Sequence, residues 1–380
     1  MKNQQENTRL IHNGHWKDDP IGASSLPIYR ASTYNQDPRE DSVPYDYVRS
    51  GNPTRAALEE AIADLENGQY GFAFASGIAA ISSALMLFKS GDHIIVGEDI
   101  YGGTYRVLTA ILERWGLQTS WVDAADLAAV EAAISPETAG ILVESPSNPL
   151  MRICDMIAIA ELAKKHNLLS LTDNTFMTPL LQKPLDLGFD IVLHSATKFL
   201  GGHSDVLAGL AVVSDSALAT RLRQVQIGFG AVLSPDDSWL VLRGMRTLGV
   251  RLAAQQQSAS ALAEWLQKQK RISQVYYPGL ANHLHRSMHE RQSSGSGAVL
   301  SFELENRTAA LDFMAKVQIP LTAVSLGGVE SIVSHPATMS HAAMPPEERK
   351  SRGINDGLLR LSVGLESVDD LITDFSQALS

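Results

Sequence analysis

The stretch IVLHSATKFLGG, residues 191–202, is the most informative segment of the chain. Its first half is an apolar run typical of a buried strand. The run leads into Lys198, with the hydroxyl side chains of Ser195 and Thr197 just before it. Desolvation at the end of a strand can lower the pKa of an amine, which favours covalent chemistry with carbonyl compounds. The segment therefore predicts a strand that presents a reactive lysine beside two possible phosphate ligands.

An acidic residue upstream suggests what this lysine binds. Asp173 follows the apolar run Leu168–Leu171. A reactive lysine, a phosphate site and an acid for a pyridine nitrogen are what pyridoxal 5'-phosphate requires. Taken singly, Lys198 is equally a solvated lysine and Asp173 a helix cap. Together they lead us to expect pyridoxal 5'-phosphate as the cofactor.

The chain around this segment alternates between strand-like and helix-like patterns. Runs that are apolar on both faces, separated by helical segments, indicate an α/β fold with a mainly parallel sheet between helices. Asn52-Pro53 is a good helix start, and Gly68 a plausible stop for that helix. The expected strands are 72–75, 93–96, 120–122, 141–143, 168–171, 191–193 and 210–213.

Three regions follow from these patterns. Residues 1–50 lack periodicity and predict an extended arm that wraps a neighbouring subunit. Residues 51–240 form the large α/β domain. Residues 241–380 form a smaller α+β domain, with a long helical stretch through 239–265, a strand at 299–303 and a terminal helix at 368–379.

Composition narrows the class of protein. The 380 residues carry a net charge of −11, which argues against binding nucleic acid or an anionic membrane. Cys154 is the only cysteine, so neither an intramolecular disulfide nor a thiolate metal cluster can form. The first residues lack a signal-peptide pattern, and Ile78–Phe88 is too short to span a bilayer. We expect a cytoplasmic protein.

Histidines invite a metal interpretation. His283, His285 and His289 stand close together, but their charged neighbours favour a solvated helix face. We predict no metal site.

Further candidates lie at or near the predicted strand ends, where ligands of open α/β sheets bind. Ala75-Ser76-Gly77-Ile78 opens a helix whose free N–H groups suit a phosphate, although Ser76 alone could simply cap it. Tyr101 could stack on a planar ring, or be an ordinary half-buried tyrosine. Asn148 could bind a ligand or serve as a turn residue. Arg360, between apolar residues, needs an anion, either a ligand carboxylate or a structural salt bridge.

The chain resembles a known family, the Cys/Met metabolism enzymes. These enzymes depend on pyridoxal phosphate and have fold type I, which is aspartate aminotransferase-like. The family includes cystathionine β- and γ-lyases, cystathionine γ-synthases and methionine γ-lyases. The resemblance extends from Pro27 to the C-terminus. It is carried by segments 47–55 (YVRSGNPTR), 75–77 (ASG), 101–104 (YGGT), 144–149 (ESPSNP), 173–176 (DNTF), 194–198 (HSATK) and 360–366 (RLSVGLE).

The resemblance implies a role for each candidate residue. Lys198 would form the Schiff base and act as the base, and Asp173 would pair with the pyridine nitrogen. Tyr101 would stack on the ring and help to transfer protons. The implied phosphate ligands are Ser195, Thr197, the N–H groups of Gly77 and Ile78, and Tyr47 and Arg49 donated by a neighbouring subunit. The implied ligands of the substrate carboxylate are Asn148, Ser325 and Arg360. The implied assembly is a homo-oligomer, a dimer usually paired into a homotetramer.

The resemblance also suggests a reaction. Methionine γ-lyases usually carry cysteine at the position of Gly103. Many γ-lyases and γ-synthases carry glutamate at the position of Val324. Segments 199–205 and 340–345 are similar to bacterial cystathionine β-lyases.

We therefore expect trans-sulfuration chemistry: a lyase that splits the small-molecule amino acid L-cystathionine by β-elimination into homocysteine, pyruvate and ammonia. A cystathionine γ-lyase or γ-synthase is the alternative, and a methionine γ-lyase is a weaker one. A non-catalytic binder that kept the fold is the competing class.

Overall fold

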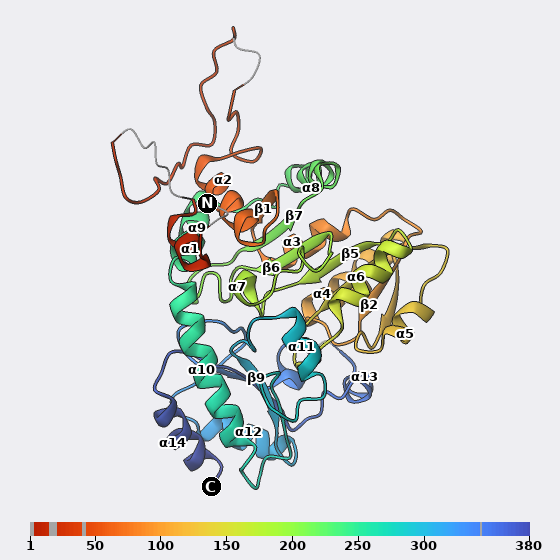
Figure 1. Cartoon of the computed structure of the whole chain (residues 1–380), viewed down its shortest axis with the longest axis vertical. Coiled ribbons are helices and arrows are strands. Elements are labelled where there is room, and N and C mark those ends of the chain that lie inside the picture. Colours follow the sequence, from red (N-terminus) through yellow and green to blue (C-terminus); the bar gives the residue numbers. More distant parts are fainter. Residues whose placement is uncertain (1–3, 15–20, 40–42, 343) are drawn as a thin grey trace.

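The computed structural model describes residues 4–14, 21–39, 43–342 and 344–380. Parts of the predicted arm lie outside these described residues. Two β-sheets, each covered by helices, form the body of the molecule, and the long helix α10 (Leu248–Leu266) runs from one to the other (Figure 1).

The first sheet has seven strands in the order β1-β7-β6-β5-β4-β2-β3. Strand β7 pairs antiparallel with both of its neighbours, and the other pairings of the sheet are parallel. Each of the seven predicted runs overlaps one of these strands, with residues 75 and 168 falling just outside, so the mainly parallel α/β sheet is confirmed. The strands are β1 (Tyr70–Phe74), β2 (His93–Gly97), β3 (Gln118–Val122), β4 (Thr138–Glu144), β5 (Leu169–Asp173), β6 (Ile191–Ser195) and β7 (Gly209–Val213).

Helices cover both faces of this sheet. In β7, Ala211 and Val213 join the core under helices α3, α4 and α8, whereas Leu210 and Val212 join the core shared with α2 and α9. Burial of successive side chains on opposite faces explains why the inner strands of the sheet are largely apolar. The helices of this domain are α2 (Pro53–Leu65), α3 (Gly77–Leu85), α4 (Gly102–Ala110), α5 (Leu127–Ala132), α6 (Met156–Lys165), α7 (Thr178–Leu181), α8 (Ser216–Phe229) and α9 (Pro235–Met245), with a 3₁₀ turn at Leu112–Trp115.

Helix α2 begins where the sequence predicts. The Asn52 side chain accepts hydrogen bonds from the N–H groups of Thr54 and Arg55. Its predicted stop is wrong by one residue, because Asn67, with φ of 59°, makes the left-handed turn. Gly68 serves packing instead, since a Cβ there would lie 2.3 Å from Val212 Cγ1.

The second sheet forms the smaller domain, with strand order β10-β11-β12-β9-β8. Helices α10, α12 and α14 cover one of its faces through a shared apolar core. The remaining elements are β8 (Gln274–Tyr276), β9 (Val299–Glu303), β10 (Leu321–Thr322), β11 (Ile332–Ser334), β12 (Leu358–Ser362), α11 (Arg286–Gln292), α12 (Arg307–Lys316), α13 (Pro346–Ser351), α14 (Val368–Ala378) and a 3₁₀ turn at Pro336–Thr338.

The predicted single helical stretch through 239–265 is two helices, α9 and α10. Gly244, near the end of α9, packs so closely on the loop after β6 that a Cβ would lie 2.1 Å from Gly201 O. Arg251 in α10 bonds back to Gly244 O at 2.8 Å across the break. The predicted domain boundary at 240/241 thus falls inside α9, and it stays a prediction.

The predicted arm is not extended throughout. It contains helix α1 (Glu6–His12), which Arg9 ties to Asp64 of α2 at 2.8 Å. Of the described residues between α1 and α2, some loop away from the body, whereas Leu26 is buried in the core shared with α2 and α9 (Figure 1).

The interpretation of the histidines as a solvated face is wrong for His289. Its side chain is buried in α11, and Nε2 lies 2.8 Å from Gly295 O. Burial lowers the pKa of this imidazole. No helix in the described ranges is long and apolar enough to cross a membrane.

Candidate active site

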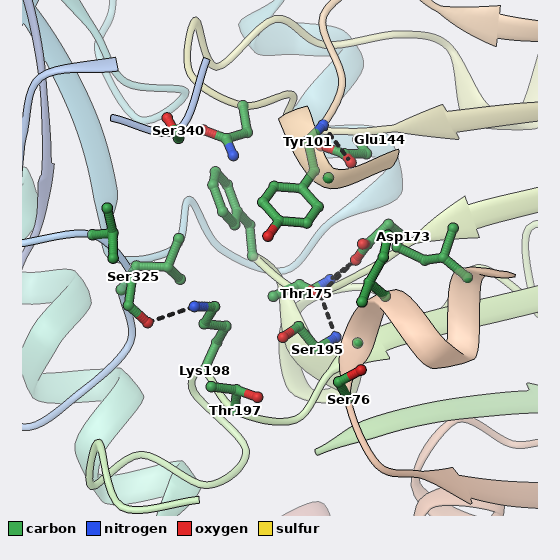
Figure 2. Close-up of a pocket in the computed structure, with 18 of the residues that line it drawn as sticks. Ser76, Tyr101, Glu144, Asp173, Thr175, Ser195, Thr197, Lys198, Ser325 and Ser340 are labelled. Atoms are coloured by element: carbon green, nitrogen blue, oxygen red, sulfur yellow. Dashed lines mark hydrogen bonds between the residues drawn. The ribbon is translucent and has the colours of Figure 1, made fainter. Parts of the chain in front are cut away.

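A cavity of about 330 Å³ lies where the carboxyl ends of β4, β5 and β6 face the second sheet (Figure 2). The loop that carries Val324 and Ser325, together with Arg360 of β12, forms its other side. This volume is within the range of small-molecule sites. Ten of the twelve predicted site residues line the cavity: Gly77, Ile78, Tyr101, Asn148, Asp173, Ser195, Thr197, Lys198, Ser325 and Arg360.

Lys198 projects into the cavity from the turn after β6 (Figure 2). Its Nζ donates a hydrogen bond to Ser325 Oγ. Burial, and then the positive charge of Arg360, lower the pKa of this amine to about 8, while Asp173 opposes the shift. A fraction of the amine is therefore unprotonated near neutral pH, as a base or nucleophile requires.

Asp173 ends β5 on the opposite side of the cavity. Its Oδ1 accepts hydrogen bonds from the N–H of Thr175 at 2.9 Å and from the Thr175 hydroxyl. Burial raises the pKa of Asp173, and the Thr175 bonds, His194 and Lys198 hold it down. Oδ2 accepts no hydrogen bond from the described residues, so it is free for a cationic N–H donor.

The first turn of α3 forms the third side of the site. Ser76 caps this helix, its Oγ accepting from Ala79 N at 3.1 Å, so the capping interpretation is correct for Ser76 itself. The N–H groups of Gly77 and Ile78 remain free of intrahelical partners, as at any helix start. A Cβ on Gly77 would lie 2.8 Å from Ser195 Oγ, so only glycine lets this turn approach β6 so closely. The result is a pocket of N–H donors and a hydroxyl that suits a phosphate.

The second hydroxyl, on Thr197, already has partners. Its Oγ1 donates to Ala208 O at 3.2 Å and accepts from Ala208 N at 3.0 Å. Because a hydroxyl has one proton, Thr197 can donate to a phosphate only by turning that proton away from Ala208.

Tyr101 precedes α4, and its ring points into the cavity (Figure 2). Its N–H donates to Glu144 Oε1 at 3.0 Å. The ring lies against Gly103, where a Cβ would be 2.3 Å from Tyr101 Cε1. Gly103 thus makes room for the ring in this orientation.

Arg360 is 3% exposed and has no carboxylate partner among the described residues. Nη1 donates to Asn148 Oδ1 at 2.9 Å, Nη2 donates to Ser325 O at 2.8 Å, and Nε has no partner. Burial lowers the pKa of this guanidinium to about 10. A buried cation without a counter-charge favours an anionic ligand over the structural salt bridge that the sequence left open.

Two predicted residues lie outside the cavity. Arg49 Nη1 donates to Ile227 O at 3.0 Å, and the Arg49 guanidinium stacks on Tyr47, whose side chain is 46% exposed. Within one chain, neither residue reaches the phosphate end of the site.

Sequence reasoning missed several residues that line the cavity. Glu144 and Thr175 lie beside Asn148 and Asp173 in segments singled out for other residues. Arg106, one turn into α4, adds a second guanidinium to the cavity. The signal for Glu144 was its position at a strand end, which it shares with Asp173; nothing in the sequence distinguished Arg106 from a surface arginine.

Similarity to known proteins covers the whole of this architecture. The sequence model of the family described as "Cys/Met metabolism PLP-dependent enzyme" matches residues 7–380. The cystathionine beta-lyase MetC of Bacillus subtilis strain 168 is 57% identical, over 98% of this chain and 95% of that protein. The cystathionine gamma-lyase of the same organism is 46% identical, over 99% of each. The crystal structure of cystathionine gamma-lyase from Lactobacillus plantarum complexed with L-serine superposes with a TM-score of 0.96 at 48% identity, over 99% of this chain and 98% of that one.

Proposed function

The chain belongs to the Cys/Met metabolism family of pyridoxal-phosphate-dependent enzymes, and from this premise we propose that it cleaves L-cystathionine by β-elimination. The products are homocysteine, pyruvate and ammonia. The observation that carries the proposal is the unpaired, buried Arg360 beside a lysine of lowered pKa. This pair suits an α-amino acid whose carboxylate is fixed while its Cα proton is removed.

The residues of the cavity fit pyridoxal phosphate. The turn at Gly77 and Ile78, together with Ser195 and Thr197, suits the phosphate group. The free Oδ2 of Asp173 suits the protonated ring nitrogen, and Lys198 suits the aldehyde carbon. When bound, pyridoxal phosphate supplies a conjugated ring that takes up the electrons released as the Cα–H bond of an amino acid breaks.

The chain's own groups position the substrate and move its protons. Arg360 binds the α-carboxylate through a fixed pair of guanidinium N–H donors. Asn148 and Ser325 are the polar groups beside it. The unprotonated fraction of Lys198, which the lowered pKa increases, removes the Cα proton through Nζ. Lys198 or the Tyr101 hydroxyl then delivers a proton to the departing sulfur.

The far half of cystathionine carries a second carboxylate. Arg106 on α4 lines the same cavity and offers that group a guanidinium. The relative with 57% identity and the fit of a dicarboxylic substrate both favour cystathionine over a shorter amino acid.

We assign Tyr47 and Arg49 to the phosphate of a neighbouring subunit. Leu207, at the rim of the cavity, is 60% exposed, consistent with a neighbour covering this side. A homotetramer built as a dimer of dimers, and a cytoplasmic location, stay predictions.

One product assay tests the reaction. The holoenzyme is incubated with L-cystathionine, and the keto acid and thiol are identified. We expect pyruvate with homocysteine; 2-oxobutyrate with cysteine would instead establish γ-cleavage. Dependence on an acylated homoserine would establish a synthase. Lys198→Ala is the control, and its loss of product shows that the signal comes from this site.

A further inference from the structure

A small crevice lies beneath the cavity and shares Glu144 with it. It offers about 20 Å³ to the centre of a water molecule. A single water occupies roughly 10–15 Å³, so the crevice has room for at least one water. Its polar lining consists of Glu98, Asp99, Asp123, Glu144, Ser147 and Arg152.

Asp99 is the buried acid of this crevice. Asp99 lies two residues after the end of β2 and is 7% exposed. Oδ2 accepts a hydrogen bond from the Ser147 hydroxyl, whereas Oδ1 is buried without a hydrogen-bond partner among the described residues. A buried carboxylate oxygen without a donor is costly, and a single water in the adjoining space would satisfy it.

Glu144 faces a second acid on its other side. Strands β4 and β5 pair Glu144 directly with Asp173, so the two carboxylates project from neighbouring strand ends. Oε1 of Glu144 accepts the N–H of Tyr101, and Oε2 accepts nothing from the described residues. Burial, and then the charges of Asp173 and Asp99, raise the pKa of Glu144 well above its ordinary value. Because each negative charge disfavours the other, ionisation of one of these neighbouring carboxylates opposes ionisation of the second.

We propose that the crevice binds one water molecule that bridges Asp99 and Glu144, and that Glu144 is a protonated positioning residue that leaves the negative charge of the pair on Asp173. Glu144 then holds the backbone of Tyr101 without competing for the cationic ring nitrogen. The water links Glu144 to solvent through the half-exposed Asp123 at the mouth of the crevice. This inference rests on the cofactor binding that the proposed function requires.

Charged groups face Glu144 both from the crevice and from the cavity. Asp99, Glu98 and Asp123 add negative charge from below, and Arg152 is the cation of the crevice, 3.0 Å from Glu98. The groups that face it across the cavity are Asp173, Lys198, Arg106, Arg360 and the Tyr101 phenol.

Infrared difference spectroscopy of the holoenzyme tests the protonation of Glu144. At neutral pH we expect a carboxylic-acid C=O band that is present in the wild type and absent from Glu144→Gln. Glu98→Gln, a matched change of an acid in the same crevice, is expected to leave that band in place. If Glu144→Gln removes no such band, Glu144 is ionised and the inference is wrong.

Cofactor affinity provides a second readout. Glu144→Gln mimics the neutral acid, so we expect it to hold pyridoxal phosphate within about threefold of the wild type. Asp173→Asn loses a charge-assisted hydrogen bond and is expected to weaken binding at least about tenfold. Equal weakening in both variants would overturn the assignment of the charge to Asp173. Neither readout depends on which substrate is cleaved, so failure here is distinct from failure of the product assay.

The link through the water is tested at Asp99. Asp99→Asn removes a neighbouring negative charge, so the Glu144 band should disappear at a pH about one unit lower than in the wild type. Asp123→Asn, at the exposed mouth, should shift it much less. If Asp99→Asn does not fold, Ser147→Ala removes the hydroxyl donor that favours ionised Asp99 and should shift the band in the same direction. Equal shifts for the inner and outer acids would refute the bridge.

Discussion

Ser325 has a backbone φ of 90°, a conformation that residues with a side chain rarely adopt. The conformation has two effects in the site. It places Ser325 Oγ within reach of Lys198 Nζ, and it directs Ser325 O to Arg360 Nη2 at 2.8 Å. The residue therefore connects the base to the carboxylate clamp at the expense of local strain.

Substitutions at Ser325 separate the strain from the hydroxyl. Ser325→Ala and Ser325→Gly both lose the contact with Lys198, and we expect kcat/KM to fall about tenfold in each. Ser325→Gly also relieves the strain, so its free energy of unfolding should exceed that of Ser325→Ala by about 1 kcal/mol. Urea unfolding and steady-state kinetics measure both effects; equal stability of the two variants would show that the backbone is unstrained.

At the scale of residues, the sequence pointed to charged side chains, whose burial costs free energy. Lys198, Asp173 and Arg360 stand out because each is a charged side chain next to apolar strand residues. Glu144 stands at a strand end as Asp173 does, but its pairing with Asp173 depends on the register of β4 against β5, which the local sequence does not show. Tyr47 and Arg49 had a predicted role only through resemblance, and one chain does not bring them to the site.

At the scale of elements, the segment 335–353 ties the smaller domain to α4. Ser340 lines the cavity, and its carbonyl lies against Gly102, where a Cβ would be 2.2 Å away. Glu348 accepts a hydrogen bond from the Tyr105 hydroxyl at 2.9 Å, and the Arg352 guanidinium lies 5.5 Å from the centre of the Tyr105 ring. These contacts fix the helix that follows Tyr101.

His341 lies buried in this segment and makes the free energy of unfolding of the protein depend on pH. Burial, followed by the charge of Arg360, lowers the pKa of His341 to about 4. Between the unfolded pKa of about 6.5 and this value, the unfolded chain binds more protons than the native one. Stability is therefore full above pH about 6.5 and is lost as the pH falls toward about 4, by up to about 3 kcal/mol.

We expect His341→Gln to flatten this acid limb, as measured by urea unfolding at pH about 5 and about 7. His166→Gln, a change at an exposed histidine, is the control and should keep the wild-type slope. A His341→Gln variant whose stability falls as steeply as the wild type would show that other groups cause the acid loss.

The strands were predictable for a reason that does not extend to the helix ends. Strands buried on both faces are mostly apolar, so the inner strands of the first sheet stand out in the sequence, whereas the partly exposed edge strand β3 was predicted only over residues 120–122. The break between α9 and α10 depends on Gly244 meeting the loop at Gly201, and α1 depends on Arg9 reaching Asp64. Both are contacts between segments far apart in the sequence, and the spacing of apolar residues along the chain does not predict such contacts.

At the scale of the whole molecule, the proposed site needs two chains. Arg49→Ala should weaken pyridoxal phosphate binding about tenfold or more, since it loses a charged hydrogen bond to phosphate. Titration of the apoprotein with the cofactor measures the loss. Unchanged affinity would remove Arg49 from the phosphate site.

Mixed assemblies decide whether Arg49 acts on its own chain or on a neighbour. If it acts across the interface, pairing an Arg49→Ala subunit with a Lys198→Ala subunit rebuilds one intact site. At a pyridoxal phosphate concentration too low to load Arg49→Ala, co-refolded mixtures should then show more activity than the two variants measured separately. If Arg49 serves its own chain, the mixture regains nothing.

The bond between Arg360 and Asn148 joins residues 212 positions apart and links β12 of the second sheet to the loop after β4 of the first. The two residues of the clamp are therefore encoded in different halves of the gene, and recombination between the halves can separate them. A crossover in the stretch that encodes α10 would combine an arginine from one parent with an asparagine from another. Such a hybrid would keep both cores, but its carboxylate clamp would form only if the two halves dock in the same relative position as in the parents.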